Sequence, residues 1–436
     1  MEVASVSGPD AATLAAWVVD ARERSLAVLD EPDQTHLEIP PYLPTVNPLR
    51  WELCHVAWFQ DHFVLQRGFG LEATDEEAAR IFDSAAVGHE RRWRQEPPSI
   101  ARVRSYLSAV RDRVLVELER SEPTPELRDL VLLGLCHEDM HAEAFLYMRQ
   151  SLGLTAPGAA ASLSGVQTPS PDGDVEMPGG SFRLGAESDG DFVFDNERGA
   201  HAVELESFRI ARLPVSQGEL QAFVVDGGYE RPEVWSTAGW RWRQATSAQQ
   251  PLYWKRDGEG GWLRRQFDDW RPVEPDLPAV HVSWYEADAW CRWAGRRLPS
   301  EAEWEAAAAA ETDDGALAAN KRLHPWGEAP PDAALANLDA RELGCVARRG
   351  YAAGDTPLGC RQLYGNVWEW TASTFMPYPG FEPGVYAEYS EPWFGARKVL
   401  RGGCWATRAR MMRNTLRNFF TPDRRDVFAG FRTCAR

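Results

Sequence analysis

The periodic segment at residues 125–153 places two histidines on one face of a single predicted helix. His137 and His141 are four residues apart, which puts their imidazoles one helical turn from each other. A third histidine, His55, lies on a second segment with helical periodicity. Three neutral imidazoles can hold a divalent transition metal and leave coordination positions open. Two unrelated core or surface histidines are the alternative, which Glu143 and His55 make less favoured.

Length and charge exclude several classes of protein. The chain has 436 residues, enough for two or three domains. Its net charge of −18 argues against a nucleic-acid or anionic-membrane partner, because such partners select a basic face. No apolar run approaches the roughly 20 residues that span a membrane, and the first residues lack the pattern of a signal peptide. We therefore expect a cytoplasmic protein.

The cysteines predict a reducing environment. Seven are scattered along the chain, and none forms a Cys-x-x-Cys pair. An odd number without this spacing indicates free thiols rather than a disulfide framework. Cys54 and Cys136 each precede a candidate ligand histidine. We interpret both as packing residues, with a redox-active thiol as the alternative.

The chain divides into two parts with different sequence patterns. Residues 1–154 show helical periodicity and predict an all-α bundle, whereas residues 155–174 have the Ala, Pro, Ser and Gly content of a linker. In residues 175–436 short apolar runs alternate with Gly, Pro, Asn and Asp, which predicts an irregular α+β domain. The predicted helices are 11–29, 47–67, 75–94, 99–120, 125–153, 216–226, 284–295 and 300–310, the last with a capping box from Ser300 to Glu303.

Motifs in both parts match known families. Those of the second part are Met177-Pro-Gly-Gly-Ser-Phe182, Arg297-Leu-Pro-Ser-Glu-Ala-Glu-Trp-Glu305, Pro325-Trp-Gly327, Gly365-Asn-Val-Trp-Glu-Trp370, Arg401-Gly-Gly-Cys-Trp405 and Gly430-Phe-Arg432. They resemble the formylglycine-generating-enzyme-like (sulfatase-modifying-factor) domain, a fold related to C-type lectins. His55 and His137-x-x-x-His141-x-Glu143 resemble the iron site of a DinB-like four-helix bundle. In this order, the two parts look like the nonheme-iron sulfoxide synthases of ergothioneine biosynthesis, over essentially the whole chain.

This resemblance implies an oxygen-dependent reaction at Fe(2+) held by His55, His137 and His141. Hercynine, the Nα-trimethyl betaine of histidine, would bind through its imidazole, a thiol donor as thiolate, and dioxygen at the last position. A carbon–sulfur bond would form at imidazole C2, with a sulfoxide as product. Neutral imidazole ligands leave positive charge on the metal, which favours an anionic sulfur or selenium ligand.

The resemblance also implies contacts with substrate. Tyr386 matches a tyrosine that acts near the iron as a proton donor or redox-active acid, and Tyr389 matches a second active-site aromatic. Asn418 matches a residue that contacts the betaine. The neighbouring Phe419 and Phe420 could hold the trimethylammonium by cation–π attraction. The alternative is that these are ordinary loop tyrosines and core phenylalanines.

Several positions depart from family members that use γ-glutamylcysteine. Phe420 stands where an Asp binds the ammonium of the donor. Of a donor-binding arginine pair only Arg92 remains, with His89 at the other position. Met140 replaces a substrate-binding glutamine between the ligand histidines, and Phe59 replaces a second glutamine near the first ligand. An anionic donor that carries an amine is therefore poorly supported.

The particular residues of three motifs resemble those of the selenoneine synthase branch. These motifs are Trp51-Glu-Leu-Cys-His55, His141-Ala-Glu-Ala-Phe145 and Arg417-Asn-Phe-Phe-Thr-Pro-Asp-Arg-Arg425. The branch is implied to join hercynine to a selenosugar through a selenoxide, so we predict a selenoneine synthase. A sulfoxide synthase that uses cysteine or γ-glutamylcysteine is the alternative.

Two more distant alternatives use different metals. A formylglycine-generating enzyme would need a copper-binding cysteine pair, but after Cys404 no cysteine occurs before Cys434. A non-catalytic binding protein could use the three histidines for a structural zinc ion.

Overall fold

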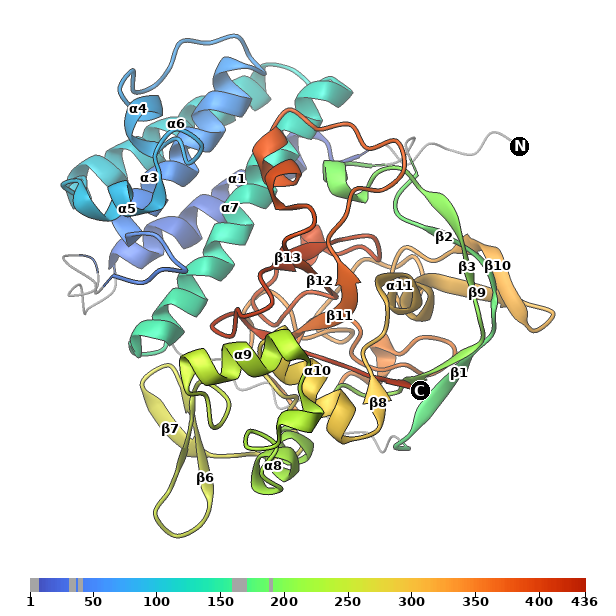
Figure 1. Ribbon diagram of the computed structural model, residues 1–436. Coiled ribbons are helices and arrows are strands. Elements are labelled where there is room, and N and C mark those ends of the chain that lie inside the picture. The colour runs from blue at the N-terminus through green and yellow to red at the C-terminus, as the bar shows by residue number, and fades with distance from the viewer. Residues whose placement is uncertain (1–7, 31–36, 38–41, 159–170, 188–190) are drawn as a thin grey trace. The chain divides into compact units, whose positions relative to one another are not determined.

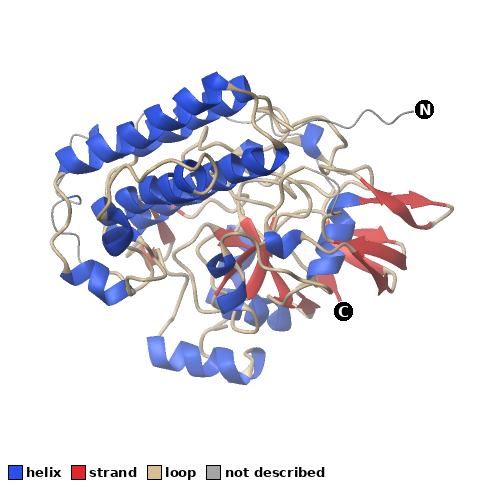
Figure 2. Cartoon of the chain, turned by 90° about the horizontal axis from the view of Figure 1, so that it is seen from above, coloured by secondary structure: helices blue, strands red, loops and turns tan. Residues whose placement is uncertain are grey.

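The computed structural model describes residues 8–30, 37, 42–158, 171–187 and 191–436. The chain divides into two compact units, Met1–Met148 with Asp189–Phe192, and Arg149–Ser188 with Val193–Arg436. Among the described residues, strands occur only in the second unit (Figure 2). The expected order of an all-α part followed by an α+β part is confirmed. Most of the predicted linker 155–174 lies outside the described residues, and its last residue, Asp174, begins a strand.

The first unit is a bundle of long helices that run side by side (Figure 1). Its elements are α1 (Ala11–Ala27), η1 (Val28–Asp30), α3 (Leu49–Gln60), η2 (Asp61–Gln66), α4 (Ala78–Phe82), α5 (His89–Arg94), α6 (Ile100–Arg120) and α7 (Pro125–Leu152). Asp10 caps α1 by accepting from the Thr13 amide at 2.8 Å. The η2 segment is a π-helix that continues α3 without a break, so the predicted helix 47–67 is one rod whose hydrogen bonding changes in its last turn.

The predicted single helix at 75–94 is wrong, because the chain leaves the helix after Phe82. The Asp83 side chain accepts from the Ala85 amide at 2.8 Å, a local hydrogen bond that competes with helix continuation. Gly88 then begins a separate helix, α5. The break leaves the last carbonyl groups of α4 without helical partners. Ile81 and Phe82 therefore have oxygen atoms available to side chains of α3.

A buried ionic network joins α1, α3 and α7. The Arg22 guanidinium donates to both Glu138 oxygens, at 2.9 and 3.1 Å, and to the Gln60 oxygen at 2.9 Å. Ser25 and Gln60 also donate to Glu138, each at 2.7 Å. Arg22 is fully buried, and Glu138 is 1% exposed. Because an unpaired charge here would be costly, the network favours the alignment of these helices that pairs both charges.

The second unit contains several small sheets. One four-stranded sheet has the order β1 (Asp174–Met177), β4 (Phe208–Ala211), β15 (Cys434–Ala435), β8 (Arg296–Arg297), and the other has β13 (Asn418–Phe420), β12 (Lys398–Arg401), β11 (Trp368–Thr374), β14 (Ala429–Gly430). The remaining strands are β2 (Gly180–Leu184) with β3 (His201–Leu205), β5 (Trp254–Arg256) with β6 (Trp262–Gln266) and β7 (Asp269–Pro272), and β9 (Ala310–Asp313) with β10 (Ala316–Lys321). Short turns of 3-10 helix lie between them, at Asp195–Glu197, Pro232–Val234, Ala352–Gly354, Ala387–Tyr389, Glu391–Trp393 and Ala409–Met411.

Four α-helices accompany these sheets. They are α8 (Gln217–Val225), α9 (Thr237–Thr246), α10 (Trp284–Trp293) and α11 (Glu301–Ala309). The predicted capping box of α11 is confirmed, since Ser300 and Glu303 each accept from the other's backbone amide. Helix α9 was not predicted, although Ser236 caps it by accepting from the Gly239 amide.

Buried arginine–glutamate pairs connect the loops of the second unit. Glu301 of α11 accepts from Arg401 at 2.9 Å and from Arg417 at 2.7 Å. Glu369 of β11 accepts from Arg432 at 2.7 Å. Hydrogen bonds between ionised partners are stronger than neutral ones, so these pairs fix segments that have little regular secondary structure.

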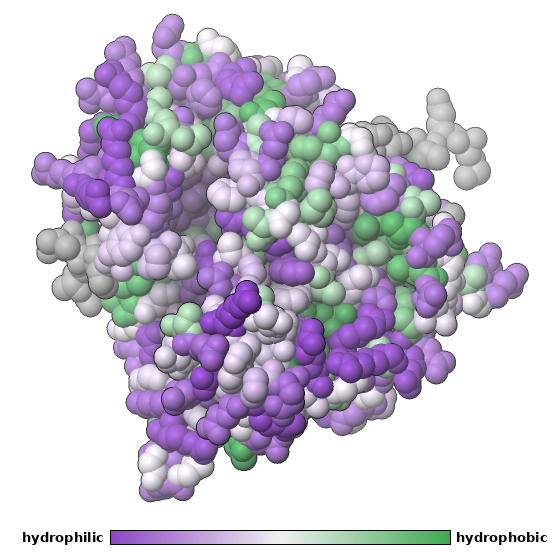
Figure 3. All heavy atoms as spheres, in the orientation of Figure 1, coloured by the Kyte–Doolittle hydropathy of each residue, from purple (hydrophilic) through white to green (hydrophobic). Residues whose placement is uncertain are grey.

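The surface and the cysteines are of the kind expected from the composition. On the face seen in Figure 3 hydrophilic residues predominate, and hydrophobic residues occur in scattered patches. Within the described part of the chain, none of the helices combines the length and apolar content needed to cross a membrane. All seven cysteines lie among the described residues, and none of them forms a disulfide bond there.

The network predicts a large effect of Arg22→Met on the stability of the bundle. Glu138 would keep its buried charge without a cation, which costs about 3–5 kcal/mol in comparable pairs. Chemical denaturation followed by helical circular dichroism should report this loss. The control is Arg24→Met, which removes an exposed pair with Asp20 and should cost less than about 1 kcal/mol. Equal losses in both variants would contradict the role given to the network.

Candidate metal centre

The structure brings the three predicted ligand histidines together in the first unit. His55 comes from α3, and His137 and His141 from α7. One nitrogen of each ring lies within 4.8 Å of the other two. In the described part of the chain this is the one group of three or more histidine, cysteine or carboxylate side chains with such spacing. His55 and His137 are buried, and His141 is partly exposed.

Two of the rings, those of His55 and His141, are held in place by a hydrogen bond at Nδ1, the nitrogen that points away from the other ligands. His55 Nδ1 lies 2.8 Å from the backbone oxygen of Phe82, and His141 Nδ1 lies 2.6 Å from the Glu52 carboxylate. Because both partners are acceptors, each Nδ1 carries the proton and each Nε2 keeps its lone pair. The Nε2 atoms of His137 and His141 face each other at 3.2 Å.

The burial of two rings and the spacing of His137 and His141 fit a bound transition metal. Burial, and next the neighbouring His141, lowers the pKa of both His55 and His137 well below the ordinary value, so these rings are neutral ligands. Two nitrogens about 2.1 Å from a shared ion are about 3.0 Å apart at a right angle and about 3.4 Å apart at the tetrahedral angle. The observed 3.2 Å separation lies between these values.

Helix α3 also supplies aromatic rings that pack on the ligands. Trp51 stacks on His55 with a centroid distance of 5.2 Å and an interplanar angle of 10°. Phe59 stacks on His137 at 3.7 Å and 7°. Phe59 is thus part of the centre, in contact with a ligand ring. Met140 lies half-buried between the two histidines of α7 in the sequence.

Arg92 and His89 lie on α5, and both use polar groups within the first unit. Three Arg92 hydrogen bonds, of 2.7–2.8 Å, go to oxygen atoms of Val87, Asn47 and Ser84. Its guanidinium also lies 4.5 Å above the Trp51 ring. His89 Nε2 is 3.2 Å from the Leu43 oxygen.

A cavity of about 710 Å³ borders Arg92, Tyr42 and Trp93. Donor binding by Arg92 and His89 stays a prediction.

The other predicted site residues gather in the second unit. Tyr389 ends a 3-10 turn, and its ring centroid lies 6.2 Å from that of Tyr386 and 5.5 Å from that of Phe419. Phe419 belongs to a buried cluster against which Tyr389 packs. Asn418, at the start of β13, accepts from the Phe419 amide at 2.8 Å. Phe420 is half-buried, and the roles of all five residues stay predictions.

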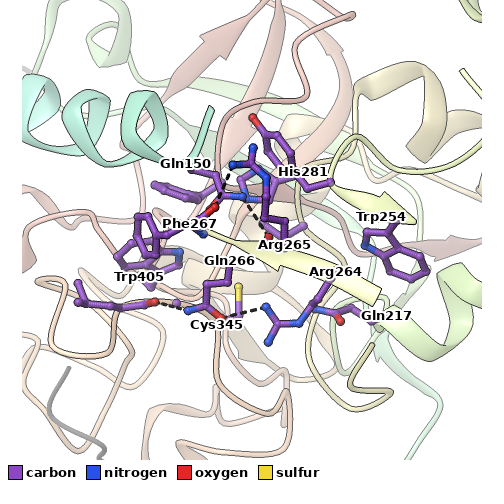
Figure 4. A pocket seen from close by; sticks show the side chains of 15 residues that line it. Gln150, Gln217, Trp254, Arg264, Arg265, Gln266, Phe267, His281, Cys345 and Trp405 are labelled. Atoms are coloured by element: carbon purple, nitrogen blue, oxygen red, sulfur yellow. Dashed lines mark hydrogen bonds between the residues drawn. The ribbon is translucent and has the colours of Figure 1, made fainter. Parts of the chain in front are cut away.

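A small cavity in the second unit has a different lining (Figure 4). It is bordered by Arg264, Gln266, His281, Cys345 and Trp405, among others, and none of the predicted site residues borders it. Its volume of about 30 Å³ leaves room for about two water molecules. His281 Nδ1 has no hydrogen-bond partner there, and burial lowers its pKa to about 4. We therefore interpret it as a hydrated cavity of the fold.

The two cysteines beside the ligands favour the packing interpretation. Cys54 is fully buried, and burial raises the pKa of its thiol to about 12. A thiol that stays protonated is a weak nucleophile and a poor candidate for redox chemistry. Cys136 is buried as well.

Two polar partners of the centre were not identified from the sequence. Glu52 lies in Trp51-Glu-Leu-Cys-His55, and its position three residues before His55 places it on the same helical face. That spacing was the available signal. No signal in the sequence pointed to the Phe82 backbone oxygen, because this oxygen can accept from His55 only where the helix breaks at Asp83.

Comparison with known proteins matches both parts of the chain. Residues 18–145 match the DinB superfamily, and residues 160–436 match the sulfatase-modifying factor enzyme 1-like domain. A hercynine oxygenase of Mycolicibacterium thermoresistibile is 38% identical, over 98% of this chain and 95% of the relative. The chain belongs to the hercynine oxygenase family. The Mycobacterium tuberculosis hercynine oxygenase is also 38% identical, over 96% of this chain and 97% of its own.

Membership of the hercynine oxygenase family confirms the predicted ergothioneine-type superfamily and makes the chain an oxidoreductase. The relatives give no support to the selenoneine branch. A formylglycine-generating enzyme of Streptomyces coelicolor is 31% identical over 64% of this chain and 94% of its own length.

The geometry predicts that each of the three histidines is needed to bind a metal. Loss of an outer hydrogen-bond partner of a ligand typically costs about 10–100-fold in metal affinity, so loss of a ligand should cost more. His55→Ala, His137→Ala and His141→Ala should therefore each weaken Fe(II) and Co(II) binding by more than about 100-fold, measured by competition with a chelator. His62→Ala, which removes an imidazole stacked on Trp58 in the same helical rod, is the matched control. Normal metal binding by His137→Ala would contradict the assignment.

Proposed function

We propose that this chain is an iron(II)- and oxygen-dependent enzyme that joins a sulfur donor to C2 of the hercynine imidazole and forms a sulfoxide. The observation that carries the proposal is the cluster of buried His55 and His137 with partly exposed His141, in a chain that matches hercynine oxygenases along almost its whole length. The iron, the hercynine and the sulfur donor are all part of this proposal.

The proposed reaction balances with one dioxygen. Hercynine loses the C2 proton and the donor loses its S–H proton. A C–S bond and an S–O bond form, and the second oxygen atom leaves as water. Bound iron(II) would supply the centre at which thiolate, imidazole and dioxygen meet. The chain's own contribution includes two buried neutral imidazoles, His55 and His137, which add no negative charge and so keep positive charge at that centre.

Tyr386 is the proposed proton donor. It lies in the long connection between β11 and β12, which the structure anchors at two places around it. Asp195 accepts from the Ser390 hydroxyl at 2.5 Å and from the Gly384 amide at 3.1 Å. These two hydrogen bonds bracket Tyr386 in the sequence and restrain the segment that carries it.

Tyr386→Phe should lower the rate of C–S bond formation while leaving the KM for hercynine nearly unchanged. Proton transfer by a positioned side chain contributes about 10²–10⁴-fold, so a loss on the order of 100-fold is expected in single-turnover assays. Oxygen should then be diverted to oxidation of the donor sulfur, which mass spectrometry detects.

The matched control for this experiment is Tyr378→Phe. Tyr378 lies in the same connection, and its buried hydroxyl has no hydrogen-bond partner. Its removal should leave the rate and the product ratio unchanged. If Tyr386→Phe and Tyr378→Phe behave alike, Tyr386 has no part in the chemical step.

The side chain at position 420 favours a second candidate donor. The Phe420 ring carries no charge, and the Arg424 guanidinium lies 4.8 Å above it. The nearby Asp426 carboxylate is already paired, because it accepts from Arg424 at 2.7 and 2.9 Å. A donor ammonium would therefore lack the carboxylate that other family members are expected to supply at position 420. A selenosugar, which carries no amine, does not need this partner, and selenoneine synthesis is therefore the second candidate.

A single substitution separates these donors. Phe420→Asp should raise kcat/KM for γ-glutamylcysteine by about tenfold or more, since a hydrogen bond to a charged group contributes about 1.5–3 kcal/mol. The same change should lower the use of a selenosugar. Phe420→Leu, which removes the ring and adds no charge, is the control. A rise in dipeptide use with Leu equal to that with Asp would show that space rather than charge decides.

A competition assay tests the proposed function itself. Anaerobically purified protein would be loaded with Fe(II), supplied with hercynine and air, and offered cysteine, γ-glutamylcysteine, a thiosugar and a selenosugar together. The proposal expects oxygen consumption that depends on hercynine and a sulfoxide as the main product. A selenium product in excess would replace the first candidate with the second. Activity with zinc alone or the absence of any hercynine adduct would refute both.

A further inference from the structure

We infer that Glu52 is a positioning residue for the metal centre, which fixes the tautomer and the orientation of His141. This inference rests on the proposed metal site but not on the identity of either substrate. Glu52 is 4% exposed and lies in α3, where Glu52 and His55 are three residues apart and share one face. Helix α3 therefore supplies both a ligand and the carboxylate that holds a ligand of α7.

The contact itself is short and directed. Glu52 Oε1 lies 2.6 Å from His141 Nδ1, on the opposite side of the ring from Nε2. His141 Nε2 faces His137 Nε2 at 3.2 Å. With Nδ1–H donated to the carboxylate, the lone pair of His141 is confined to Nε2 and directed toward the other two ligands. A ring turned over about its Cβ–Cγ bond would lose the hydrogen bond and point a carbon atom at the carboxylate.

The three ligand rings have different supports, and only one of these supports is charged. A backbone oxygen holds His55, an aromatic face covers His137, and a carboxylate holds His141. His141 is also the one ring of the three that is not fully enclosed by packing, with 18% of its side chain exposed. The ring that packing restrains least thus receives the strongest hydrogen bond, because a carboxylate is a better acceptor than a neutral group.

The carboxylate should also strengthen His141 as a ligand. A negative charge on the outer nitrogen raises the electron density at the inner one, which increases metal affinity. Outer partners of this type typically contribute 10–100-fold to affinity. Glu52 is buried, so its charge acts at short range with little screening by solvent.

The test measures metal binding without any substrate. Glu52→Ala should weaken Co(II) and Fe(II) binding to the full-length protein by about 10–100-fold. It should also change the visible absorption of the bound Co(II), because His141 would no longer be held in one orientation. Glu52→Gln keeps a neutral acceptor oxygen, so its affinity should fall less than that of Glu52→Ala.

A control separates positioning from general stability. Asp61 is a buried carboxylate in the helical rod that begins with α3, and it accepts from Thr74 and Tyr106 rather than from a ligand. Asp61→Asn should lower thermal stability and leave the Co(II) affinity and spectrum unchanged. Wild-type affinity and spectrum in Glu52→Ala, with binding lost in His141→Ala, would overturn the inference and leave the metal site intact. Binding retained in every histidine variant would instead refute the site on which the proposed function depends.

Discussion

The buried Arg22–Glu138 pair is the interaction on which the geometry of the first unit depends. Glu138 follows His137 directly in α7, so the two side chains leave the helix about 100° apart. Glu138 meets Arg22 and Ser25 of α1 and Gln60 of α3, while His137 meets the other two ligands. Any slip of α7 along its neighbours would leave a charge unpaired in the interior, which is far more costly than lost apolar contact. The ionic network thus sets the register in which the three imidazoles meet.

The second unit uses similar pairs for a different purpose. Its strands are short, and long connections join them, so few residues are held by backbone ladders. Glu301 binds two arginines that are sixteen positions apart, at Arg401 and Arg417, and thereby joins β12 to the segment before β13. Bidentate and paired hydrogen bonds to arginine restrain both distance and angle. In this unit such pairs hold the segments together, as the hydrogen bonds of a larger sheet do in other proteins.

Sequence periodicity identified features that depend on neighbours along the chain. The pairing of His137 with His141 follows from helix geometry, and the capping box from Ser300 to Glu303 is equally local. The helix break at Asp83 was missed because one side-chain hydrogen bond outweighs weak periodicity. The pairing of Arg22 with Glu138 spans 116 residues and has no local pattern. Tyr386 and Asn418 were reached only through resemblance, since nothing in their own segments distinguishes them from ordinary loop and strand residues.

The stacking of Phe59 on His137 connects a predicted substrate contact to the candidate metal centre. Position 59 is one of those at which this chain departs from the relatives that are expected to use a dipeptide, and it also covers the face of a ligand ring at a centroid distance of 3.7 Å. A polar residue introduced there to contact a new donor would remove that cover and alter the packing of the ring. A substitution of Phe59 is therefore expected to change the packing of the metal site as well as any contact with the donor. A designer who changes this residue would need to repack α7 against α3 at the same time.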